Sequence, residues 1–212
     1  MLVVIQARSS SKRFTNKVLY PIYGKPLIFH LIDNLQKTKK KINIVVSTSN
    51  HKSDDKLANL LRLNNINVYR GSLLNVALRL FNTAKKYNSN YFVRISGDSP
   101  LFDFRILDKA LLIKKKIKRF DIVSNVFPRT FPKGQSVEII RTSIIKKNLS
   151  KFNINHKEHV TSYFYENSSK FRIKNFINNY KYTPLKLSID TINDLNKIKK
   201  KIKKKNFSNF KL

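Results

Sequence analysis

Cysteine is absent from this chain of 212 residues, and acidic residues are scarce. The lack of cysteine excludes disulfides and thiolate metal sites and is typical of reducing compartments, so we expect a cytoplasmic protein. Long apolar runs are also absent: none could span a bilayer, and the N-terminus lacks the pattern of a signal peptide. We therefore expect no membrane insertion. Hydrophobic residues still make up 41% of the chain, which is enough for one domain with a real core.

The shortage of acids leaves a large positive charge, because 44 lysines and arginines face 12 acidic residues and the net charge is +32. Such a charge attracts nucleic acid and anionic membranes without specificity, so a basic nucleic-acid-binding module is one alternative for this chain. Lysine and asparagine are spread over almost all polar positions, however, which favours a lysine-rich surface. No strand face interleaves aromatic residues with arginine as a platform for stacked bases would. We expect no specific nucleic-acid partner.

The apolar segments alternate between two periodicities. Short runs rich in β-branched residues predict strands at 2–6, 42–46, 68–72, 91–95, 121–125, 136–140, 171–173 and 186–190. Apolar residues at helical spacing predict helices at 26–37, 53–61, 76–84, 106–113, 156–165 and 191–202. Ser53 is the expected cap of the second helix. This alternation predicts an α/β fold in which a single domain surrounds a mainly parallel central sheet.

A basic loop at 7–17 follows the first strand. Open α/β sheets bind ligands at the carboxyl ends of their strands, where this loop is expected to lie. Its backbone N–H groups and serine hydroxyls can line a polyanion, while Arg8, Arg13 and Lys17 supply charge. Taken alone, the loop is better explained as a solvated basic surface. Thr48, at the end of the second strand, is a candidate for contact with a base or ribose, and an ordinary strand-to-helix turn explains it equally well.

Two aspartates stand at predicted strand ends in this acid-poor chain. Asp98 follows strand 91–95 and Gly97, and Asp190 ends strand 186–190 and precedes a helix. If the strands are parallel, both carboxylates open on one edge of the sheet, beside the basic loop. Mg²⁺ prefers carboxylate and phosphate oxygens, and without a metal the two charges would repel each other. Considered separately, each aspartate is equally explained as the start of a turn or the cap of a helix.

These segments carry a resemblance to a known family. The patterns Q-A-R-x-x-S-x-R-x-x-x-K at 6–17, G-D-x-P at 97–100 and D-T-x-x-D-L at 190–195 resemble motifs of the cytidylyltransferases that make CMP-activated sugars. The most similar branch is the SpsF-like one, named for spore-coat polysaccharide synthesis. Acylneuraminate and 3-deoxy-manno-octulosonate cytidylyltransferases are its relatives. The resemblance implies the nucleotide-diphospho-sugar transferase (GT-A-like) fold.

The resemblance also implies roles for single residues. In the family the first loop holds the triphosphate of CTP, and we assign nucleotide binding to Ala7, Arg8, Ser11, Arg13, Lys17 and Thr48. Catalytic roles fall on Lys17, Asp98 and Asp190, with Asp98 and Asp190 as ligands of Mg²⁺. Where the family usually has glycine, proline and glycine, this chain has Ser10, Thr15 and Asn16. Asn16 can still adopt the left-handed conformation that a glycine would provide.

The acceptor site is expected from two further segments, 123–134 and 158–161, which also resemble the family. We assign acceptor binding to Arg129, Glu138, Glu158 and His159. Arg129 suits a carboxylate or phosphate, whereas His159 is equally explained as a helix histidine with satisfied hydrogen bonds. Ser136 replaces an aspartate that the family often carries, which weakens the case for an acceptor role of its strand.

The resulting hypothesis is one domain over 1–212, with a nucleotide-binding half (1–118), an acceptor and subunit-contact region (119–185) and a metal-ligand strand with a C-terminal helix (186–212). It is expected to make a CMP-activated acidic sugar and pyrophosphate from CTP for surface polysaccharide synthesis, and a homodimer is compatible with it. Two alternatives remain beside it. One is a related nucleotidyltransferase with another nucleotide or a phosphate or phosphonate acceptor, and the other is the nucleic-acid-binding module.

Overall fold

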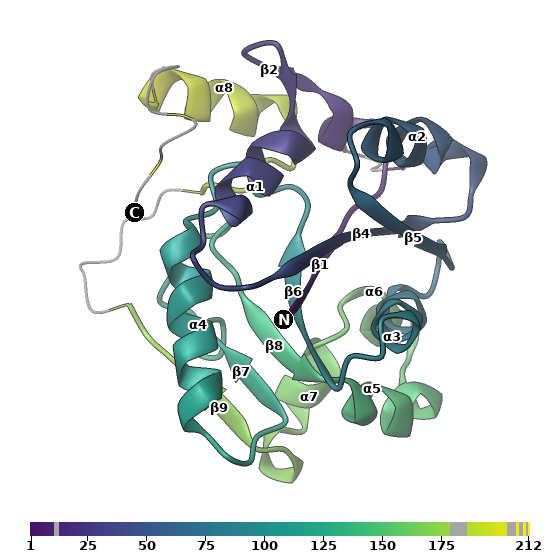
Figure 1. Cartoon of the computed structure of the whole chain (residues 1–212), viewed down its shortest axis with the longest axis vertical. Coiled ribbons are helices and arrows are strands. Elements are labelled where there is room, and N and C mark those ends of the chain that lie inside the picture. The colour runs from purple at the N-terminus through teal and green to yellow at the C-terminus, as the bar shows by residue number, and fades with distance from the viewer. Residues whose placement is uncertain (11–12, 179–185, 203–206, 208–209, 211) are drawn as a thin grey trace.

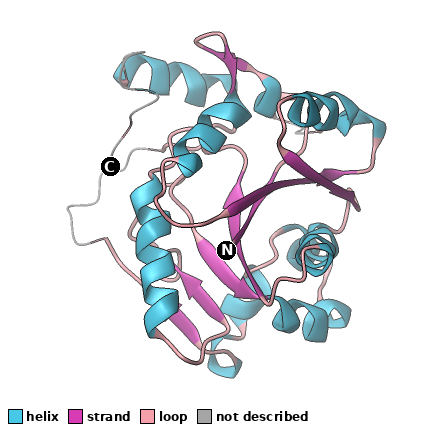
Figure 2. Cartoon of the chain, viewed as in Figure 1, coloured by secondary structure: helices cyan, strands magenta, loops and turns pink. Residues whose placement is uncertain are grey.

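The computed structural model describes residues 1–10, 13–178, 186–202, 207, 210 and 212, and it centres on a seven-stranded sheet (Figures 1 and 2). In spatial order the strands are β5 (Asn67–Gly71), β4 (Asn43–Ser49), β1 (Leu2–Gln6), β6 (Tyr91–Ser96), β8 (Glu138–Arg141), β7 (Ile122–Ser124) and β9 (Ile173–Asn175). Strands β5, β4, β1 and β6 are parallel to one another. Strand β8 is antiparallel to β6 and β7, and β9 is parallel to β7. The predicted α/β fold with a mainly parallel sheet is confirmed.

The helices cover both faces of this sheet. They are α1 (Leu27–Gln36), α2 (Asp55–Leu63), α3 (Val76–Lys86), α4 (Phe104–Lys116), α5 (Thr142–Asn148), α6 (Ile154–Glu158), α7 (Ser162–Glu166) and α8 (Ile192–Lys201). Figure 1 shows α1 and α4 on one side of the sheet and α3 and α5 on the other. Within the described residues, no helix combines the length and the apolar character needed to cross a membrane.

The side chains of β1 divide the core, because successive residues of a strand point to opposite faces. Val3 and Ile5 pack with apolar residues of α1, α2 and α4, whereas Leu2 and Val4 pack with those of α3, α5 and α7. A third cluster joins the hairpin of β2 (Pro21–Ile22) and β3 (Lys25–Pro26) to α8. Strand β1 is therefore held between two apolar layers. The basic loop that follows it begins at a fixed place on the sheet edge.

The segment 186–190 differs from its prediction, because it forms no strand. Its backbone bonds go to loops at the edge of the sheet: Leu187 N–H donates to the carbonyl of Lys133 (2.7 Å), and Ile189 N–H donates to that of Asp98 (2.9 Å). No ladder with a neighbouring strand can form in that position, although Leu187 and Ile189 are apolar and buried. The predicted strand was wrong, but the segment still places Asp190 at the edge of the sheet where Asp98 lies.

Local helix predictions also needed correction. Ser53 is not a helix cap: it lies in a short 3₁₀ helix that His51 caps by accepting from Ser53 N–H. The predicted helix 156–165 is two short helices, α6 and α7, with His159 at the break between them. Strand β9 begins at Ile173 and so replaces the strand expected at 171–173. The C-terminal helix forms as α8, but the lysines at 203–205 lie outside the described residues.

The absence of a side chain at Gly134 allows the segment 186–190 to lie against the backbone at this position. Gly134 has a positive φ of 96°, and a Cβ atom there would lie 2.5 Å from the carbonyl carbon of Leu187 and from the nitrogen of Ser188. These are backbone atoms, so they cannot turn aside as a flexible side chain would. Gly24 offers a comparison, because it also has a positive φ (83°) but no atom lies within 4 Å of the position that a Cβ would take.

We expect Gly134→Ala to destabilise the protein more than Gly24→Ala. A residue with a Cβ in the left-handed region costs about 1–2 kcal/mol at either site. Only Gly134→Ala adds a backbone collision, which we expect to cost about 1–3 kcal/mol more. Urea unfolding of both variants and the wild type measures the difference. Equal losses would mean that the contact of Gly134 with Leu187 and Ser188 does not constrain the fold.

Candidate active site

The carboxyl ends of β1 and β6 meet closely, and Gly97 makes this possible. The two strands are parallel neighbours, and Gly97 N–H donates to the carbonyl of Gln6 (2.9 Å). A Cβ on Gly97 would lie only 2.8 Å from the Cβ of Ala7, closer than real Cβ atoms approach one another. The absence of a side chain therefore places Asp98 directly beside the start of the basic loop.

The basic loop folds back on itself through Asn16. This residue adopts the left-handed conformation with φ 56°, which asparagine tolerates, and its N–H donates to the carbonyl of Ser9 (2.9 Å). A short 3₁₀ helix, Lys17–Leu19, follows at once. The turn thus brings Lys17 back to the sheet edge. Ser11, which we assigned to nucleotide binding, lies outside the described residues.

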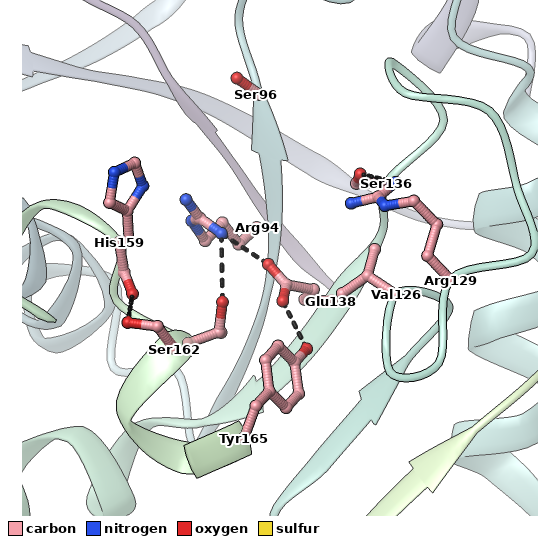
Figure 3. Close-up of a pocket in the computed structure, with 10 residues that line it drawn as sticks. Arg94, Ser96, Val126, Arg129, Ser136, Glu138, His159, Ser162 and Tyr165 are labelled. Carbon is pink, nitrogen blue, oxygen red and sulfur yellow. Dashed lines mark hydrogen bonds and ion pairs between the residues drawn. The ribbon is translucent and has the colours of Figure 1, made fainter.

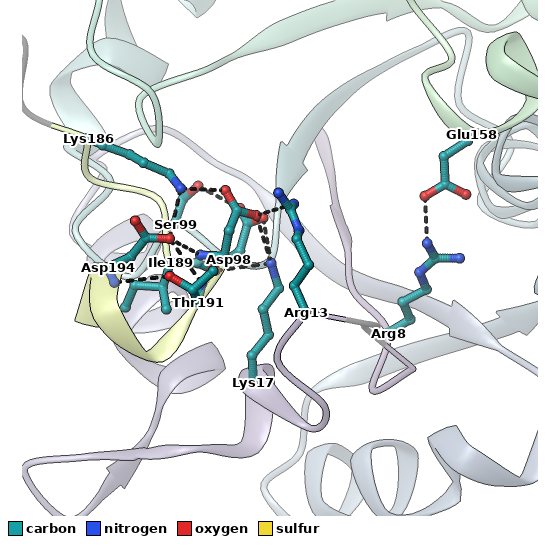
Figure 4. A network of polar contacts seen from close by, with 11 residues as sticks. Arg8, Arg13, Lys17, Asp98, Ser99, Glu158, Lys186, Ile189, Thr191 and Asp194 are labelled. Atoms are coloured by element: carbon teal, nitrogen blue, oxygen red, sulfur yellow. Dashed lines mark hydrogen bonds and ion pairs between the residues drawn. The ribbon is translucent and has the colours of Figure 1, made fainter. Parts of the chain in front are cut away.

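Lys17 joins the two predicted metal ligands. Its Nζ donates to Oδ2 of Asp98 (3.0 Å), to Oδ1 of Asp190 (3.3 Å) and to the carbonyl of Ile189 (3.0 Å). Arg13 also donates to Oδ1 of Asp190 (3.1 Å). Figure 4 shows Lys17 and Arg13 of the basic loop converging with Asp98 from the end of β6, beside Ile189 of the segment before α8. The three residues assigned catalytic roles are therefore brought together, although their chemical roles remain predictions.

Asp190 has a second lysine partner. Lys186 Nζ lies 2.8 Å from Oδ2 of Asp190 and 2.7 Å from Oδ2 of Asp194. Burial acts to raise the pKa of Asp190, but the ammonium groups of Lys186 and Lys17 hold it below its usual range. The pKa of Asp194 falls to about 2, because bonds from Lys186 and the backbone outweigh its burial. We name Arg13, Lys17, Asp98, Lys186 and Asp190 the ion network.

The ion network corrects the expected repulsion between Asp98 and Asp190, and it permits the expected metal site. Without a metal the two carboxylates do not simply repel each other, because Lys17 lies between them. Their facing oxygens fit a hard cation, since Mg²⁺ is commonly bound by one or two carboxylates together with phosphate oxygens. The described residues contain no group of three or more histidines or acids that could hold a metal alone. Asp98 and Asp190 therefore fit a metal ion that is shared with a phosphate ligand.

Arg8 does not join the ion network. Its NH2 group donates to Oε1 of Glu158, 2.7 Å away, at the end of α6. Figure 4 shows this pair apart from the convergence around Asp98. Glu158 was assigned to acceptor binding, but in this structure its carboxylate holds an arginine of the basic loop. The pair connects the predicted phosphate-binding loop to the helix that precedes His159.

Sequence reasoning missed a buried support of the basic loop. Asp54 accepts from the N–H of Ser9 (2.6 Å) and from both the N–H (3.1 Å) and the hydroxyl of Ser49. Its carboxylate is completely buried, and these hydrogen bonds outweigh burial to lower its pKa. Thr48 is also completely buried, so this arrangement does not support its predicted nucleotide contact. The signal available in the sequence was a rare acid just after the second strand.

Arg79 of α3 is a second missed residue under the loop. It is fully buried, and it donates through NH1 to the carbonyl of Ser72 (2.5 Å). Its Nε and NH2 have no hydrogen-bond partner in the part of the chain that the structure describes. Burial and the charge of Arg8 lower its pKa to about 10. Helical spacing in the sequence does not distinguish this arginine from a solvent-exposed one.

A pocket of about 380 Å³, shown in Figure 3, opens at the end of β6, where Ser96 lines it. Its lining residues are Arg94, Ser96, Val126, Arg129, Ser136, Glu138, His159, Thr161, Ser162 and Tyr165, and we name it the basic pocket. Three of the four predicted acceptor residues line it: Arg129, Glu138 and His159. Strand β6 connects the basic pocket to the ion network, because Ser96 in the pocket precedes Asp98 by only two positions.

Glu138 lies at the base of this pocket, and both of its carboxylate oxygens accept hydrogen bonds. It accepts from Arg94 NH1 (2.6 Å) and from the hydroxyl of Tyr165 (2.5 Å), and its side chain is only 4% exposed. Burial and the neighbouring Glu138 raise the pKa of Tyr165, which keeps the phenol protonated as a donor. Glu138 therefore orients Arg94 and neutralises part of its charge. The role of Arg94 was not visible in the sequence, because its partner lies on a different strand.

Charge in the basic pocket favours an anion. Glu138 is the only acid among the lining residues, and Arg94 pairs with it. Arg129 is exposed and donates only to the hydroxyl of Ser136 (3.0 Å) among the described contacts, so its guanidinium keeps donors for a ligand. Figure 3 shows Arg129 and His159 on opposite sides of Arg94. A small carboxylate or phosphate can be bound between these groups.

Comparison with known proteins adds independent evidence. The sequence profile of a family described as cytidylyltransferase matches residues 2–210. An uncharacterized protein of Methanocaldococcus jannaschii is 34% identical over 195 residues, which are 90% of this chain and 78% of that protein. The spore coat polysaccharide biosynthesis protein SpsF of Bacillus subtilis is 26% identical over 209 residues, covering 94% and 85% of the two chains. The structure of a cytidylyltransferase from Leptospira borgpetersenii has a TM-score of 0.87 at 32% identity, covering 93% and 84%.

The buried carboxylate of Asp54 leads to a stability prediction. Asp54→Asn places an amide N–H₂ against the backbone donor of either Ser9 or Ser49, which we expect to cost about 2–3 kcal/mol at pH 7. Because the folded-state pKa of Asp54 is lowered, its contribution is complete above the unfolded-state pKa and is lost as pH falls through the folded value. Denaturant unfolding from pH 7 to pH 3 should therefore show the gap between wild type and variant closing below about pH 4.

The neighbouring Asp55 supplies the control for this experiment. Its carboxylate pairs with Arg70 (2.6 Å) at the surface, where it is 52% exposed. Asp55→Asn should cost less than about 1 kcal/mol, as exposed ion pairs do. A gap between wild type and Asp54→Asn that widened on acidification would contradict the assignment of Asp54 as an ionised acceptor.

Proposed function

This chain belongs to the cytidylyltransferase family, as its motifs predicted, and is therefore a nucleotidyltransferase; we propose that it transfers CMP from CTP to an acidic sugar. The observation that carries this proposal is the adjacency of the ion network and the basic pocket on one strand end. Asp98 lies beside cations suited to a triphosphate, and Ser96, two residues earlier, lines a pocket suited to an anionic acceptor. The two substrates would thus approach each other across the end of β6.

The proposed reaction is a displacement at the α-phosphorus of CTP. An acceptor hydroxyl oxygen forms a bond to that phosphorus and its proton passes to solvent water, while the bond from phosphorus to the oxygen shared with the β-phosphate breaks and pyrophosphate leaves with the electron pair. Arg13 and Lys17 hold phosphate oxygens, and Arg8 and Ser11 are proposed to join them. Such a reaction depends on positioning and charge neutralisation more than on covalent help from the protein.

Asp98 and Asp190 are the residues that would hold Mg²⁺. When bound, the metal ion neutralises negative charge on the phosphates. The protein's own contribution is to hold the two carboxylates side by side, with Lys17 between them. The contacts of Ile189 and Gly97 with neighbouring backbone fix the segments that carry both carboxylates, so little reorganisation is needed. These roles remain proposals that rest on the geometry of the ion network.

The acceptor is proposed to be a sugar that carries a carboxylate. Arg129 and His159 offer donors at the rim of the basic pocket, and Arg94, oriented by Glu138, offers charge at its base. Glu158 is better explained as the partner of Arg8 than as an acceptor ligand. The similarity to a spore coat polysaccharide protein supports a role in surface polysaccharide synthesis. We propose a cytoplasmic reaction, in keeping with the cysteine-free chain, and a homodimer through 119–185 stays a prediction.

The alternative functions differ in the nucleotide and in the acceptor that the protein would use. Membership of an enzyme family sets aside the non-catalytic nucleic-acid-binding module. A different nucleotide, or a phosphate or phosphonate acceptor, remains the second candidate, because the guanidinium groups of Arg94 and Arg129 suit a phosphate as well as a carboxylate. The geometry of the basic pocket favours an anion of either kind.

Pyrophosphate release tests the proposal directly. The purified protein is incubated with Mg²⁺, each of the four nucleoside triphosphates, and a panel of 2-keto sugar acids, neutral sugars and sugar phosphates. We expect release with CTP and at least one sugar acid, and none with neutral sugars. Release that required a sugar phosphate, or another nucleotide, would replace the proposal with the second candidate.

The two aspartates give the sharpest mutational prediction. Asparagine keeps the size of aspartate but removes the charge that binds a hard cation, so Asp98→Asn or Asp190→Asn should each cost on the order of 3–4 kcal/mol of transition-state stabilisation, roughly a hundred- to thousandfold in rate. The double variant should lose much less than the sum, because both residues act through one ion. Rates of pyrophosphate release at varied Mg²⁺ concentration provide the measurement.

The control for both changes is Asp33→Asn, which removes a half-exposed carboxylate paired with Lys25. Its rate should equal that of the wild type. Because Lys17 and Lys186 lose a partner in the active-site variants, a modest fall in stability is expected, and rates are compared at a temperature where all proteins are folded. Wild-type activity in Asp98→Asn would contradict the proposed metal site.

A further inference from the structure

The place between Asp98 and Asp190 is filled by a side chain of the protein itself. Lys17 Nζ lies 3.0 Å from Oδ2 of Asp98 and 3.3 Å from Oδ1 of Asp190. We propose that Lys17 and the divalent cation compete for these two carboxylates, so that the cation binds firmly only together with the triphosphate. This inference rests on the proposed function, because it takes Asp98 and Asp190 as the metal ligands.

The geometry of Lys17 supports mutual exclusion. An ammonium group has three N–H donors, and Lys17 has three acceptors within hydrogen-bond distance: the two carboxylates and the carbonyl of Ile189 (3.0 Å). That carbonyl is held in place, because Ile189 N–H donates to the carbonyl of Asp98 (2.9 Å). The Lys17 side chain is only 12% exposed. A cation that joined the same two oxygens would occupy the space that the ammonium group now fills.

The other cations of the ion network oppose a bare metal ion as well. Oδ2 of Asp190 is paired with Lys186 (2.8 Å), and Oδ1 accepts from Arg13 (3.1 Å). Three basic side chains therefore face the three carboxylates of Asp98, Asp190 and Asp194, and no negative charge is left in excess. A divalent cation arriving alone would find the negative charge of these carboxylates already compensated, and it would also have to displace hydrogen bonds that are already made.

A bound triphosphate would free the carboxylates for the metal ion. It brings several anionic oxygens, which can take over Arg13 and Lys17 and release the facing oxygens of Asp98 and Asp190. Lysine is suited to such an exchange, because its ammonium group is a compact charge on a flexible chain of four carbons. Lys17 would then have two successive partners: the carboxylates before the nucleotide binds, and the phosphates afterwards. Lys17 is in this respect a positioning residue for the metal site.

Binding of Mn²⁺ in the absence of nucleotide tests the proposal, with free Mn²⁺ measured by electron paramagnetic resonance. Lys17→Met keeps the length and apolar stem of the side chain but removes the ammonium group. We expect Lys17→Met to bind Mn²⁺ at least about tenfold more tightly than the wild type, because the carboxylates lose their internal cation. Lys25→Met removes the same charge from a pair with Asp33 outside the ion network and should leave Mn²⁺ affinity unchanged.

Thermal unfolding gives a second readout that does not depend on catalysis. Without divalent cations, Lys17→Met should melt below the wild type, since two carboxylates are left facing each other. Added Mg²⁺ should raise the melting temperature of Lys17→Met and have little effect on the wild type. If Lys17→Met does not fold, Lys17→Gln replaces it, because the neutral amide can still donate to the carbonyl of Ile189 while leaving the carboxylates uncompensated.

The outcomes separate this inference from the proposed function. Equal Mn²⁺ affinity in the wild type and Lys17→Met, or tighter binding by the wild type, would overturn the competition. If CTP-dependent pyrophosphate release by the wild type persisted in that case, the proposed function would stand without it. Failure of every variant to bind Mn²⁺, even with CTP present, would overturn both the competition and the metal site at Asp98 and Asp190.

Discussion

The contact of one lysine with two aspartates sets the relation between three segments that are far apart in the chain. Lys17 arrives from the basic loop, Asp98 from the end of β6 and Asp190 from the segment before α8. Two glycines make room for this meeting: Gly97 lets β6 end against Ala7, and Gly134 lets the backbone of residues 187 and 188 lie against it. The rest of the sheet holds these points at fixed distances.

The few acidic residues of the chain hold the basic loop and several basic side chains in place. Asp54 anchors the backbone of the basic loop, Asp98 and Asp190 hold Lys17, and Glu138 holds Arg94 at the base of the basic pocket. In each case a buried or partly buried carboxylate is satisfied by several donors, as a buried charge requires. These contacts hold Lys17 and Arg94 at one edge of the sheet, beside the place proposed for two anionic substrates.

Much of the fold was readable from local pattern, because a parallel sheet needs apolar strands alternating with amphipathic helices. The left-handed turn at Asn16 and the metal-ligand candidates at Asp98 and Asp190 also follow from local chemistry. Segment 186–190 was misjudged, because its backbone partners are loop carbonyls that no periodicity reveals. The pairing of Arg8 with Glu158 and of Arg94 with Glu138 depends on long-range packing. The burial of Thr48 depends on the helices that cover the strand.

The central claim is that Asp98 and Asp190 form one cation site which Lys17 leaves when nucleotide binds. Anomalous diffraction from crystals grown with Mn²⁺ and a non-hydrolysable CTP analogue measures this directly. We expect one manganese peak that touches both carboxylates and a phosphate oxygen, with the ammonium group of Lys17 moved onto the triphosphate. A manganese peak away from Asp98 and Asp190, or Lys17 still between them in the nucleotide complex, would contradict it.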